Sequence, residues 1–394
     1  MTAHYDVLIV GGGIAGLSLA SALAGSCSVA LVEAEQELAY HTSSRSARQL
    51  IPSYGPEVVQ ELTLRTLALM AARDAELPTP VLSPRSFMLI GTEGSVRAEA
   101  SGQMKPVTHA RALELCPALV PESFTAAGLD TGSFGCDAPL LLADHRQRAE
   151  AAGADIITGA RVYSGQRLGS GWEVGAGQEA FQAGVLVNAA GAWADELAVI
   201  SGVEKLGLQP YRRTAAIVDV ERSLPDDSPM VAAADNSFYF RREGGGVLIS
   251  PSEAVPSGPE DARPRPGDIE RLIVKLNQLT TLGISGVRTA WTGLRTEAAD
   301  GIPVAGFDAE APGFYWLAGQ GGYGFQTSAA MAELAAAQIL AGQGTGQDSR
   351  QRAGQEAVQD AGRSAQPAAA PDTRTRPESR TAEALAATRW SIRR

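Results

Sequence analysis

The sequence has little cysteine, no long hydrophobic run and no excess of positive charge, and each absence excludes a class of protein. Its three cysteines are too few and too far apart for a zinc cluster, a CxxC pair or a disulfide framework, so a reducing cytoplasm is expected. No stretch approaches ~20 apolar residues and no secretory signal pattern begins the chain, so no integral membrane segment is expected. The formal net charge of −11 would repel nucleic acid.

What is present is typical of an α/β protein, with 44% hydrophobic residues and 43 glycines among 394 residues. The most informative part is the beginning. An apolar run over residues 5–10 predicts a strand, the helical pattern of residues 17–23 predicts a helix, and residues 29–32 predict a second strand that ends at Glu33. The sequence Gly11-Gly12-Gly13-Ile14-Ala15-Gly16 joins the first strand to the helix, which makes a βαβ unit.

The glycine turn predicts a dinucleotide site. Gly11 permits a tight turn, Gly13 lets the backbone approach a pyrophosphate, and Gly16 lets the helix pack closely on the strand. The free amides at the start of the helix would face the phosphate oxygens. Glu33 would accept hydrogen bonds from ribose hydroxyls and would disfavour a 2′-phosphate. This motif alone does not distinguish NAD from FAD.

Later segments favour FAD and predict a second sheet. Residues 185–190 and 314–318 are apolar strands that end in glycine-containing turns, and they can join the first two strands in one parallel sheet. Residues 211–220, 237–242 and 246–250 read as antiparallel strands inserted between them. The cluster Gly321-Gly322-Tyr323-Gly324 precedes a helical run over 327–340, so a second helix start could stabilise negative charge on a reduced flavin.

The chain resembles the FAD-dependent amine and D-amino-acid oxidoreductases of the glutathione-reductase-like fold, and within them the arginine-specific dehydrogenases of bacteria. The resemblance spans residue 5 to about residue 340 and rests on these blocks: residues 11–16, 40–41 with 45–47, 82–85, 185–193, 206–210 with 212–213, 237–239, 293–295 and 320–331. Together these blocks are far more specific than the glycine motif.

The resemblance implies a FAD-binding Rossmann domain with an inserted α+β substrate domain on a mixed or antiparallel sheet. The expected FAD-binding domain comprises residues 1–48, 137–204 and 296–344, and the expected substrate domain comprises 49–136 and 205–295. Residues 345–394, which are rich in Gly, Gln, Ala, Ser, Arg and Pro, are expected to form a disordered tail. Its role is left open.

Residue by residue, the resemblance implies a catalytic set and a cofactor set. Arg213 and Arg295 would hold the substrate carboxylate, since a guanidinium fork binds a carboxylate bidentately. Tyr54 and Tyr239 would line the same pocket, and Gly322 would form a wall beside the flavin. Arg212 lies next to Arg213, and because neighbouring strand positions alternate faces, only one of the two can look inward. The predicted cofactor-binding residues are Gly11, Gly13, Ile14, Ala15, Gly16, Glu33, Arg45, Ser46, Ala47, Ala190, Gly191, Trp193, Gly321, Gly322, Tyr323, Gly324, Gln326 and Thr327.

The chain departs from the arginine-specific pattern in its substrate pocket. Phe87 stands where those enzymes carry the acid that receives the substrate guanidinium, Ile51 replaces a threonine, Ala232 a valine, and Gln49 a histidine. A phenyl face offers a cation only about 0.5 to 2 kcal/mol, less than a buried ion pair loses when one partner is removed. With Met230, these residues predict a pocket for neutral, apolar or aromatic side chains.

The expected reaction is therefore oxidative deamination of a D-amino acid. FAD would take a hydride from Cα at its N5, and the imino acid would hydrolyse to a 2-oxo acid and ammonia. The resemblance implies a non-oxygen acceptor such as a quinone. The lack of membrane and signal segments predicts a cytoplasmic protein, with peripheral contact to the inner membrane as an alternative. Two other reactions stay open: an O2-using oxidase of glycine or sarcosine, and a 2-hydroxy-acid dehydrogenase.

Two smaller expectations concern the cofactor bond and the histidines. No cysteine follows Cys136, so a covalent flavin through a cysteine of the last block is excluded and FAD is expected to bind non-covalently. His41 could line the flavin site or make a structural hydrogen bond. His4, His109 and His145 are expected on the surface. No spacing of the four histidines predicts a catalytic dyad.

Overall fold

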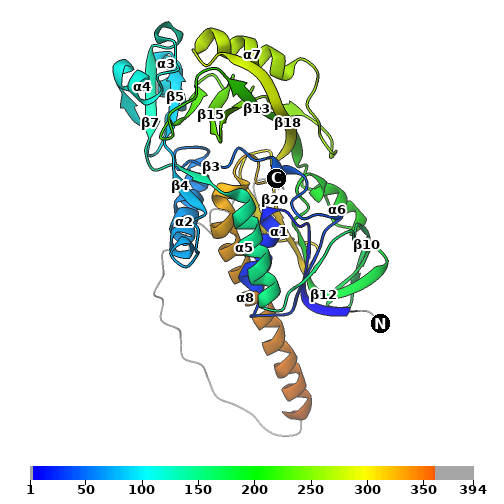
Figure 1. Ribbon diagram of the computed structural model, residues 1–394. Helices are drawn as coiled ribbons and strands as arrows, with labels where there is room; N and C mark the ends of the chain where they lie inside the picture. The colour runs from blue at the N-terminus through cyan, green and yellow to red at the C-terminus, as the bar shows by residue number, and fades with distance from the viewer. Residues whose placement is uncertain (1–2, 360–394) are drawn as a thin grey trace, which may run out of the picture.

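The computed structural model describes residues 3–359, with side chains up to residue 342, and it contains two large sheets (Figure 1). The first sheet has eight strands in the order β10-β11-β12-β1-β2-β9, with β20 beside β12 and β19 beside β20. Their bounds are β1 (Ala3–Val10), β2 (Val29–Val32), β9 (Asp155–Ile157), β10 (Val162–Leu168), β11 (Gly171–Ala176), β12 (Glu179–Asn188), β19 (Val304–Phe307) and β20 (Phe314–Ala318).

Strands from distant parts of the chain pair in parallel at the centre of this sheet. β1 pairs with both β2 and β12, and β12 pairs with β20, all parallel. Alternate residues of β1 enter different cores, with Val7 and Ile9 on one face and Leu8 and Val10 on the other. A strand covered on both faces reads as an unbroken apolar run, which is why these segments could be predicted.

Helices cover one face of the first sheet. The core on this face contains Leu17, Leu62, Ala149 and Met331, which belong to α1, α2, α5 and α8 in that order. A further helix, α6, packs near β10. The bounds are α1 (Ile14–Leu23), α2 (Glu57–Asp74), α5 (Ala138–Ala151), α6 (Ala194–Ile200) and α8 (Gly324–Gln359).

Helix α8 extends beyond the point where the tail was expected to begin. It runs to Gln359, so residues 345–359 are helical rather than irregular. Alanine, glutamine and arginine are good helix formers, and their propensity does not depend on the apolar periodicity whose absence suggested disorder. The rest of the expected tail, residues 360–394, lies outside the described residues.

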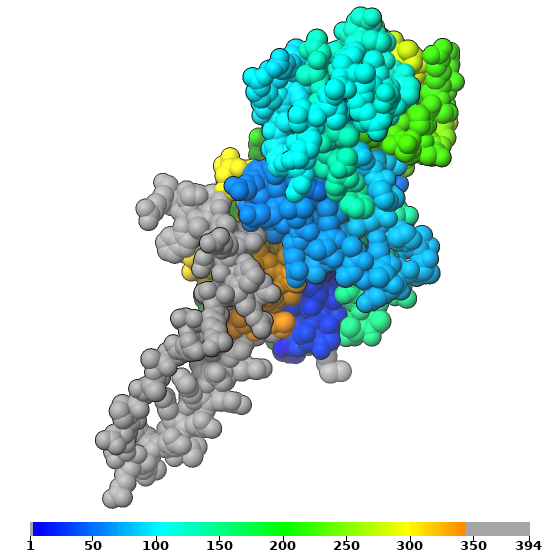
Figure 2. Space-filling model, turned by 90° about the vertical axis from the view of Figure 1, so that its left-hand side faces the viewer, coloured from blue at the N-terminus to red at the C-terminus, as the bar shows by residue number. Residues whose placement is uncertain are grey.

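The second sheet has nine strands and stands at the top of Figure 1, where it carries α3, α4 and α7. Its order is β17-β13-β16-β15-β14-β5-β7-β6, with β18 on the other side of β13. Its pairs are antiparallel except β14 with β5, so the sheet is mixed, as expected. In Figure 2 its cyan and green residues form the upper part of the molecule.

The strands of the second sheet and the helices on it come mainly from two stretches of chain. The strands are β5 (Phe87–Gly91), β6 (Lys105–Val107), β7 (Ala126–Asp130), β13 (Gln209–Val220), β14 (Met230–Ala233), β15 (Tyr239–Glu243), β16 (Gly246–Ser250), β17 (Val255–Pro256) and β18 (Ile284–Glu297). The helices are α3 (Glu93–Glu99), α4 (His109–Leu115) and α7 (Asp268–Leu279). Helices α4 and α7 bury Ala112 and Leu272 in the core of this sheet.

A third sheet of short strands, β3-β8-β4, was not predicted. Its strands are β3 (Gln49–Leu50), β4 (Leu82–Pro84) and β8 (Phe134–Cys136). Three short 3₁₀ helices complete the structure: η1 (Thr42–Arg45), η2 (Pro121–Ser123) and η3 (Gly191–Trp193). The domain boundaries given above stay a prediction.

Two further observations concern the helices. None of the helices within residues 3–359 combines the length and apolar character needed to cross a bilayer. The expectation that His145 lies on the surface is wrong, because this residue of α5 is only 6% exposed. Burial lowers the pKa of His145 to about 4, and neither ring nitrogen has a hydrogen-bond partner among the described residues.

Candidate active site

Two cavities meet at Thr42 and Ser43 of η1. The larger is about 500 Å³ and lies under the second sheet, between it and the start of α8. The smaller is about 170 Å³ and lies over the ends of β1, β2 and β12. Because both cavities are lined by Thr42 and Ser43, they lie next to each other, and together they make up the candidate site.

The smaller cavity is bordered by the glycine turn after β1. Gly11 has φ +113°, and a Cβ on it would lie 2.4 Å from the carbonyl oxygen of Ala189. A Cβ on Gly16 would lie 1.9 Å from the carbonyl oxygen of Gly11, so only glycine lets α1 pack this closely. Helix α1 has no side-chain N-cap at Gly13, and the Ile14 amide donates to Ser43 Oγ at 2.9 Å. This helix start, which Gly13 leaves without a side-chain cap of its own, is suited to a pyrophosphate.

Polar groups at the other end of the smaller cavity fit a nucleoside. Glu33 directly follows β2, and its carboxylate accepts the Gly12 amide at 2.7 Å and the Glu35 amide at 2.9 Å. The ring of His41 lies 4.5 Å from that of Trp193. Nδ1 of His41 is buried and makes no hydrogen bond within residues 3–342. The dinucleotide part of FAD therefore fits the residues present.

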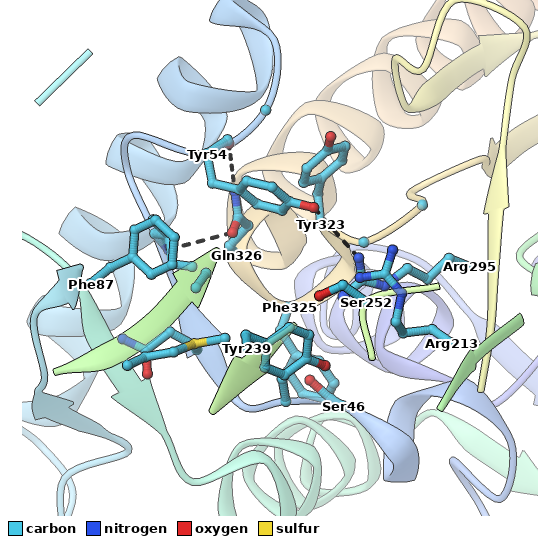
Figure 3. A pocket seen from close by; sticks show the side chains of 18 of the residues that line it. Ser46, Tyr54, Phe87, Arg213, Tyr239, Ser252, Arg295, Tyr323, Phe325 and Gln326 are labelled. Carbon is cyan, nitrogen blue, oxygen red and sulfur yellow. Dashed lines mark hydrogen bonds between the residues drawn. The ribbon is translucent and has the colours of Figure 1, made fainter. Parts of the chain in front are cut away.

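The register of β13 and β18 brings two arginines to the larger cavity. Tyr211 lies opposite Arg295, and Arg213 lies opposite Gly293. Residues opposite each other in an antiparallel pair share a face, as do residues two apart, so Arg213 and Arg295 are diagonal neighbours on one face. Figure 3 shows their guanidinium groups side by side. Gly293 leaves the space opposite Arg213 free of a side chain.

Arg212 points to the opposite face, as the strand alternation predicted. Its guanidinium pairs with Glu260 and donates to the carbonyl of Arg263. Arg213 instead donates from Nε to the carbonyl of Glu253 at 2.6 Å. Burial, together with the neighbouring charge of Arg295, lowers the pKa of Arg213. Two partly buried like charges repel each other, and an anionic ligand between them would relieve that repulsion.

An apolar wall lies across the sheet from the arginines. It comes from β5, β14 and β15, in which Phe87 pairs with Met230, and Ala232 pairs with Tyr239. Ile51 packs against the same cluster, and Phe87, Met230 and Ile51 are each at most 6% exposed. Figure 3 shows Phe87 far from Arg213 and Arg295.

Two polar side chains, Glu99 and Gln49, also line this cavity. The acidic side chain that lines this cavity, Glu99, is solvent-exposed. Gln49 also lines the cavity, with its Nε2 donating to the carbonyl of Arg85 and to Ser133 Oγ. Neither places a charge on the buried part of the wall.

Aromatic hydroxyls and a glycine turn complete the arginine end. Arg295 Nη1 donates to the hydroxyl of Tyr54 at 3.5 Å, and the ring of Tyr54 lies 5.3 Å from that of Tyr323. A Cβ on Gly322 would lie 2.8 Å from Arg295 Nη1. Glycine at this position therefore leaves room for the guanidinium.

All ten residues predicted for catalysis or substrate binding line the larger cavity. They are Gln49, Ile51, Tyr54, Phe87, Arg213, Met230, Ala232, Tyr239, Arg295 and Gly322. Of the predicted cofactor residues, the larger cavity is also lined by Ile14, Arg45, Ser46, Ala47, Gly321, Tyr323, Gly324 and Gln326. The smaller cavity is lined by Gly11, Gly13, Glu33, Ala190, Gly191 and Trp193.

Three predicted cofactor residues line neither cavity. Gly16 packs α1 on the glycine turn, Ala15 is its neighbour in that helix, and Thr327 is fully buried with its Oγ1 donating to the carbonyl of Tyr323. Arg45 lines the larger cavity, but its guanidinium donates to the carbonyls of Ala262 and Thr292 and to Asp261. These bonds connect η1 to the second sheet and the loop beside it.

Sequence reasoning missed several residues of the site. Ser43 lines both cavities and caps the start of α1 through Ile14, and Thr42 exchanges hydrogen bonds with Leu294. Neither stands out in the sequence, because a short run of serine and threonine in a loop carries no spacing signal. Other unpredicted lining residues include Arg48, Ser53, Ala98, Glu99, Ser101, Met104, Ser252 and Phe325.

Comparisons with known proteins identify the family of this chain. A family model described as DAO, FAD dependent oxidoreductase, matches residues 6–338. A glycine oxidase of Geobacillus kaustophilus is 26% identical over 340 residues, which cover 81% of this chain and 88% of that protein. An "FAD-dependent oxidoreductase domain-containing protein 1" of Bos taurus is 24% identical, covering 86% of this chain and 81% of that protein.

Solved structures show the same architecture. The crystal structure of the Geobacillus kaustophilus glycine oxidase matches with a TM-score of 0.74 and 25% identity, over 86% of this chain and 95% of that chain. An L-proline dehydrogenase from P. horikoshii matches with a TM-score of 0.76 and 18% identity, over 85% and 93% of the two chains. At that identity the second likeness shows the fold alone.

Proposed function

Because the chain belongs to the DAO family of FAD-dependent oxidoreductases, we propose that it oxidises the Cα–N bond of a D-amino acid. The proposed substrate has a neutral side chain, either apolar or aromatic. The imino acid formed would hydrolyse to a 2-oxo acid and ammonia. The family consists of FAD-dependent oxidoreductases, and the relatives of this chain include a glycine oxidase.

One observation carries the proposal: the diagonal pair of Arg213 and Arg295 on the cavity face of β13 and β18. Each guanidinium offers a fork of N–H donors, and a carboxylate is the anion that matches two such forks. The hydroxyl of Tyr54, next to Arg295, would add a third donor. A substrate carboxylate held there would have its Cα fixed in position, and orientation of this kind can supply up to ~7 to 11 kcal/mol of the barrier.

The apolar wall supports the choice of a neutral side chain. Phe87 and Met230 lie opposite each other on β5 and β14, several strands away from the arginines. A substrate carboxylate at the arginines would direct its side chain towards this wall. A guanidinium or ammonium group there would lose its hydration and find no buried carboxylate among the lining residues.

The other residues of the site would hold the cofactor. FAD, when bound, supplies the hydride acceptor. The glycine turn at Gly13 and the carboxylate of Glu33 would hold its pyrophosphate and ribose, and the start of α8 at Gly322 would border its ring system. We propose that the substrate amine loses its proton to water, since no side-chain base is needed when geometry and cofactor supply the rate. We also propose a non-oxygen electron acceptor, such as a quinone, and a cytoplasmic site of action.

The test is an anaerobic titration of the purified protein with a panel of D- and L-amino acids, followed by flavin absorbance. The expected result is bleaching of the flavin by D-leucine, D-methionine or D-phenylalanine, with weaker bleaching by D-arginine and D-lysine. Stronger reduction by the cationic pair, or reduction by the L-enantiomers alone, would overturn the proposal.

A second candidate is an O2-using oxidase of glycine or a secondary amine. It is favoured by the similarity to glycine oxidase in both sequence and structure. Peroxide formation in air with glycine or sarcosine would support this candidate and count against a dehydrogenase. A 2-hydroxy acid included in the same titration tests the remaining alternative, because the arginine pair recognises the carboxylate and not the amine.

A further inference from the structure

Three side chains hold the backbone of residues 51–55 by hydrogen bonds. This segment connects β3 to α2 and carries Tyr54. The Ser53 amide donates to the buried carboxylate of Asp130 at 3.0 Å. Ser101 Oγ donates to the Ser53 carbonyl at 2.9 Å. The third partner is Gln326, in the first turn of α8, which bonds to both Ile51 and Tyr54. Figure 3 shows its contact with Tyr54. We call residues 51–55 the Tyr54 loop.

The three partners of Gln326 fix which way its amide is turned. The Tyr54 carbonyl only accepts, so Nε2 must face it, at 3.3 Å. Thr63 Oγ1 donates its own proton to the Val59 carbonyl, so it too must accept from Nε2, at 2.9 Å. The Ile51 amide only donates, and it faces Oε1 at 3.4 Å. All three contacts require the same orientation.

This arrangement leaves Gln326 no N–H for another ligand. Both Nε2 hydrogens are used, and the side chain is only 3% exposed. The sequence predicted a cofactor-binding role for this residue, but its hydrogen bonds go to the Tyr54 loop and to α2. Tyr323, which directly precedes α8, packs closely against the far end of that loop, because a Cβ on Gly55 would lie 2.9 Å from its ring.

We infer that Gln326 is a positioning residue that acts through Tyr54, and not a cofactor ligand. Gln326 holds the backbone at Ile51 and Tyr54, and the hydroxyl of Tyr54 accepts from Arg295 Nη1 at 3.5 Å. The chain of contacts therefore runs from α8 through the Tyr54 loop to the arginine that would bind the substrate carboxylate. The inference rests on the proposed function only in assuming that Tyr54 faces the substrate.

The experiment compares Gln326→Glu with Ser328→Ala in the full-length flavoprotein. Glutamate keeps the shape and the acceptor for Ile51, but it presents an oxygen to the Tyr54 carbonyl and to Thr63. Ser328→Ala is the matched control, since it removes another buried polar side chain of the same helix, whose Oγ donates to the Phe325 carbonyl and not to the Tyr54 loop. Hydrogen exchange of residues 51–55, the ratio of FAD to protein, and kcat/KM are measured for both.

Gln326→Glu is expected to lose amide protection in residues 51–55 and to lower kcat/KM about tenfold through KM, with full FAD content. Gln326→Met, which has no amide group, is expected to do the same. In a Tyr54→Phe background, Gln326→Glu should lower kcat/KM little further, because both changes act on one contact. Ser328→Ala should leave all three readouts unchanged.

Three results would overturn the inference. They are loss of FAD from Gln326→Glu while the Tyr54 loop stays protected, effects of Gln326→Glu and Tyr54→Phe that multiply in full, and equal effects of Ser328→Ala. Failure of the proposed function looks different: the wild-type flavin would not be reduced by any D-amino acid, while the exchange measurement would still test the role of Gln326.

Discussion

The two ends of the larger cavity belong to one sheet but are built in different ways. The arginine end comes from β13 and β18, two long strands whose register places Arg213 and Arg295 diagonally, and both side chains are partly buried. The wall around Phe87 comes from the short strands β5 and β14. The comparison indicates that the arginine end determines the headgroup that binds, while the apolar end selects among substrates that share this headgroup.

Removing a charge from the arginine end should have the largest effect. Arg295→Met leaves Arg213 without its partner in binding a carboxylate, and loss of one member of a buried charged contact costs about 2 to 5 kcal/mol. The expected result is a fall in kcat/KM on the order of a thousandfold for every D-amino acid, measured by steady-state kinetics.

The control for this variant is Arg212→Met, which removes a buried arginine from the opposite face of β13. It should lower thermal stability but change kcat/KM by less than about threefold. If Arg295→Met kept most of its activity, the assignment of the arginine end would fail.

Changing the apolar end should move specificity rather than rate. Phe87→Glu places a carboxylate in the wall, where a hydrogen bond to a charged group is worth about 1.5 to 3 kcal/mol. The ratio of kcat/KM for D-arginine over D-leucine should therefore rise about 10- to 100-fold. Phe87→Leu, which keeps the wall apolar, should leave that ratio near its wild-type value. A ratio that does not respond to Phe87→Glu would show that the wall does not contact the substrate side chain.

A single methyl group at the glycine turn should disturb the arginine end only moderately. Gly322→Ala puts a Cβ 2.8 Å from Arg295 Nη1, so the guanidinium must shift by a few tenths of an ångström. The expected result is a rise in KM of about tenfold with a smaller change in kcat. Gly286→Ala, on the same strand as Arg295 but with its Cβ 3.6 Å from the nearest atom, serves as the control and should not change KM.

A buried group away from both ends should affect stability and not catalysis. The pKa of His145 is about 4 in the folded chain against 6.5 for an unperturbed histidine, so the unfolded chain takes up a proton first as the pH falls. The folded state therefore loses stability between about pH 6.5 and pH 4, by up to about 3 kcal/mol from this one group.

His145→Leu should flatten that part of the pH dependence without changing kcat/KM. The measurement is urea unfolding at pH 7 and pH 5 for both proteins. An equal drop in unfolding free energy between the two pH values in wild type and variant would contradict the assignment.

The parts of the fold that could be predicted from the sequence are those with strong local signals. Buried parallel strands such as residues 314–318 are continuous apolar runs, and the glycine turn after β1 has a fixed spacing with a steric cause at Gly11 and Gly16. The sheet β3-β8-β4 could not be predicted, because strands of two or three residues carry no periodicity. His145 was misplaced since one polar residue on a helix does not reveal which face it occupies.

More of the candidate site than of the surrounding fold could be predicted, but this prediction came largely from the family resemblance. The alternation of Arg212 and Arg213 was deducible from strand geometry alone. The hydrogen bonds of Arg45 and Gln326 were not, because their partners, Thr292 and Thr63, lie hundreds of residues away in the chain. Side-chain direction in loops and first helical turns depends on such long-range partners, and a single sequence does not display them.

The joint between η1 and β18 has a consequence for how ligands reach the cavity. Thr42 both donates to and accepts from the backbone of Leu294, and Trp291 Nε1 donates to the Arg45 carbonyl at 2.9 Å. Swinging the two sheets apart would break these bonds together with the three that Arg45 makes. These bonds oppose a hinge motion between the two sheets, so we expect ligand entry to involve segments of the cavity rim instead.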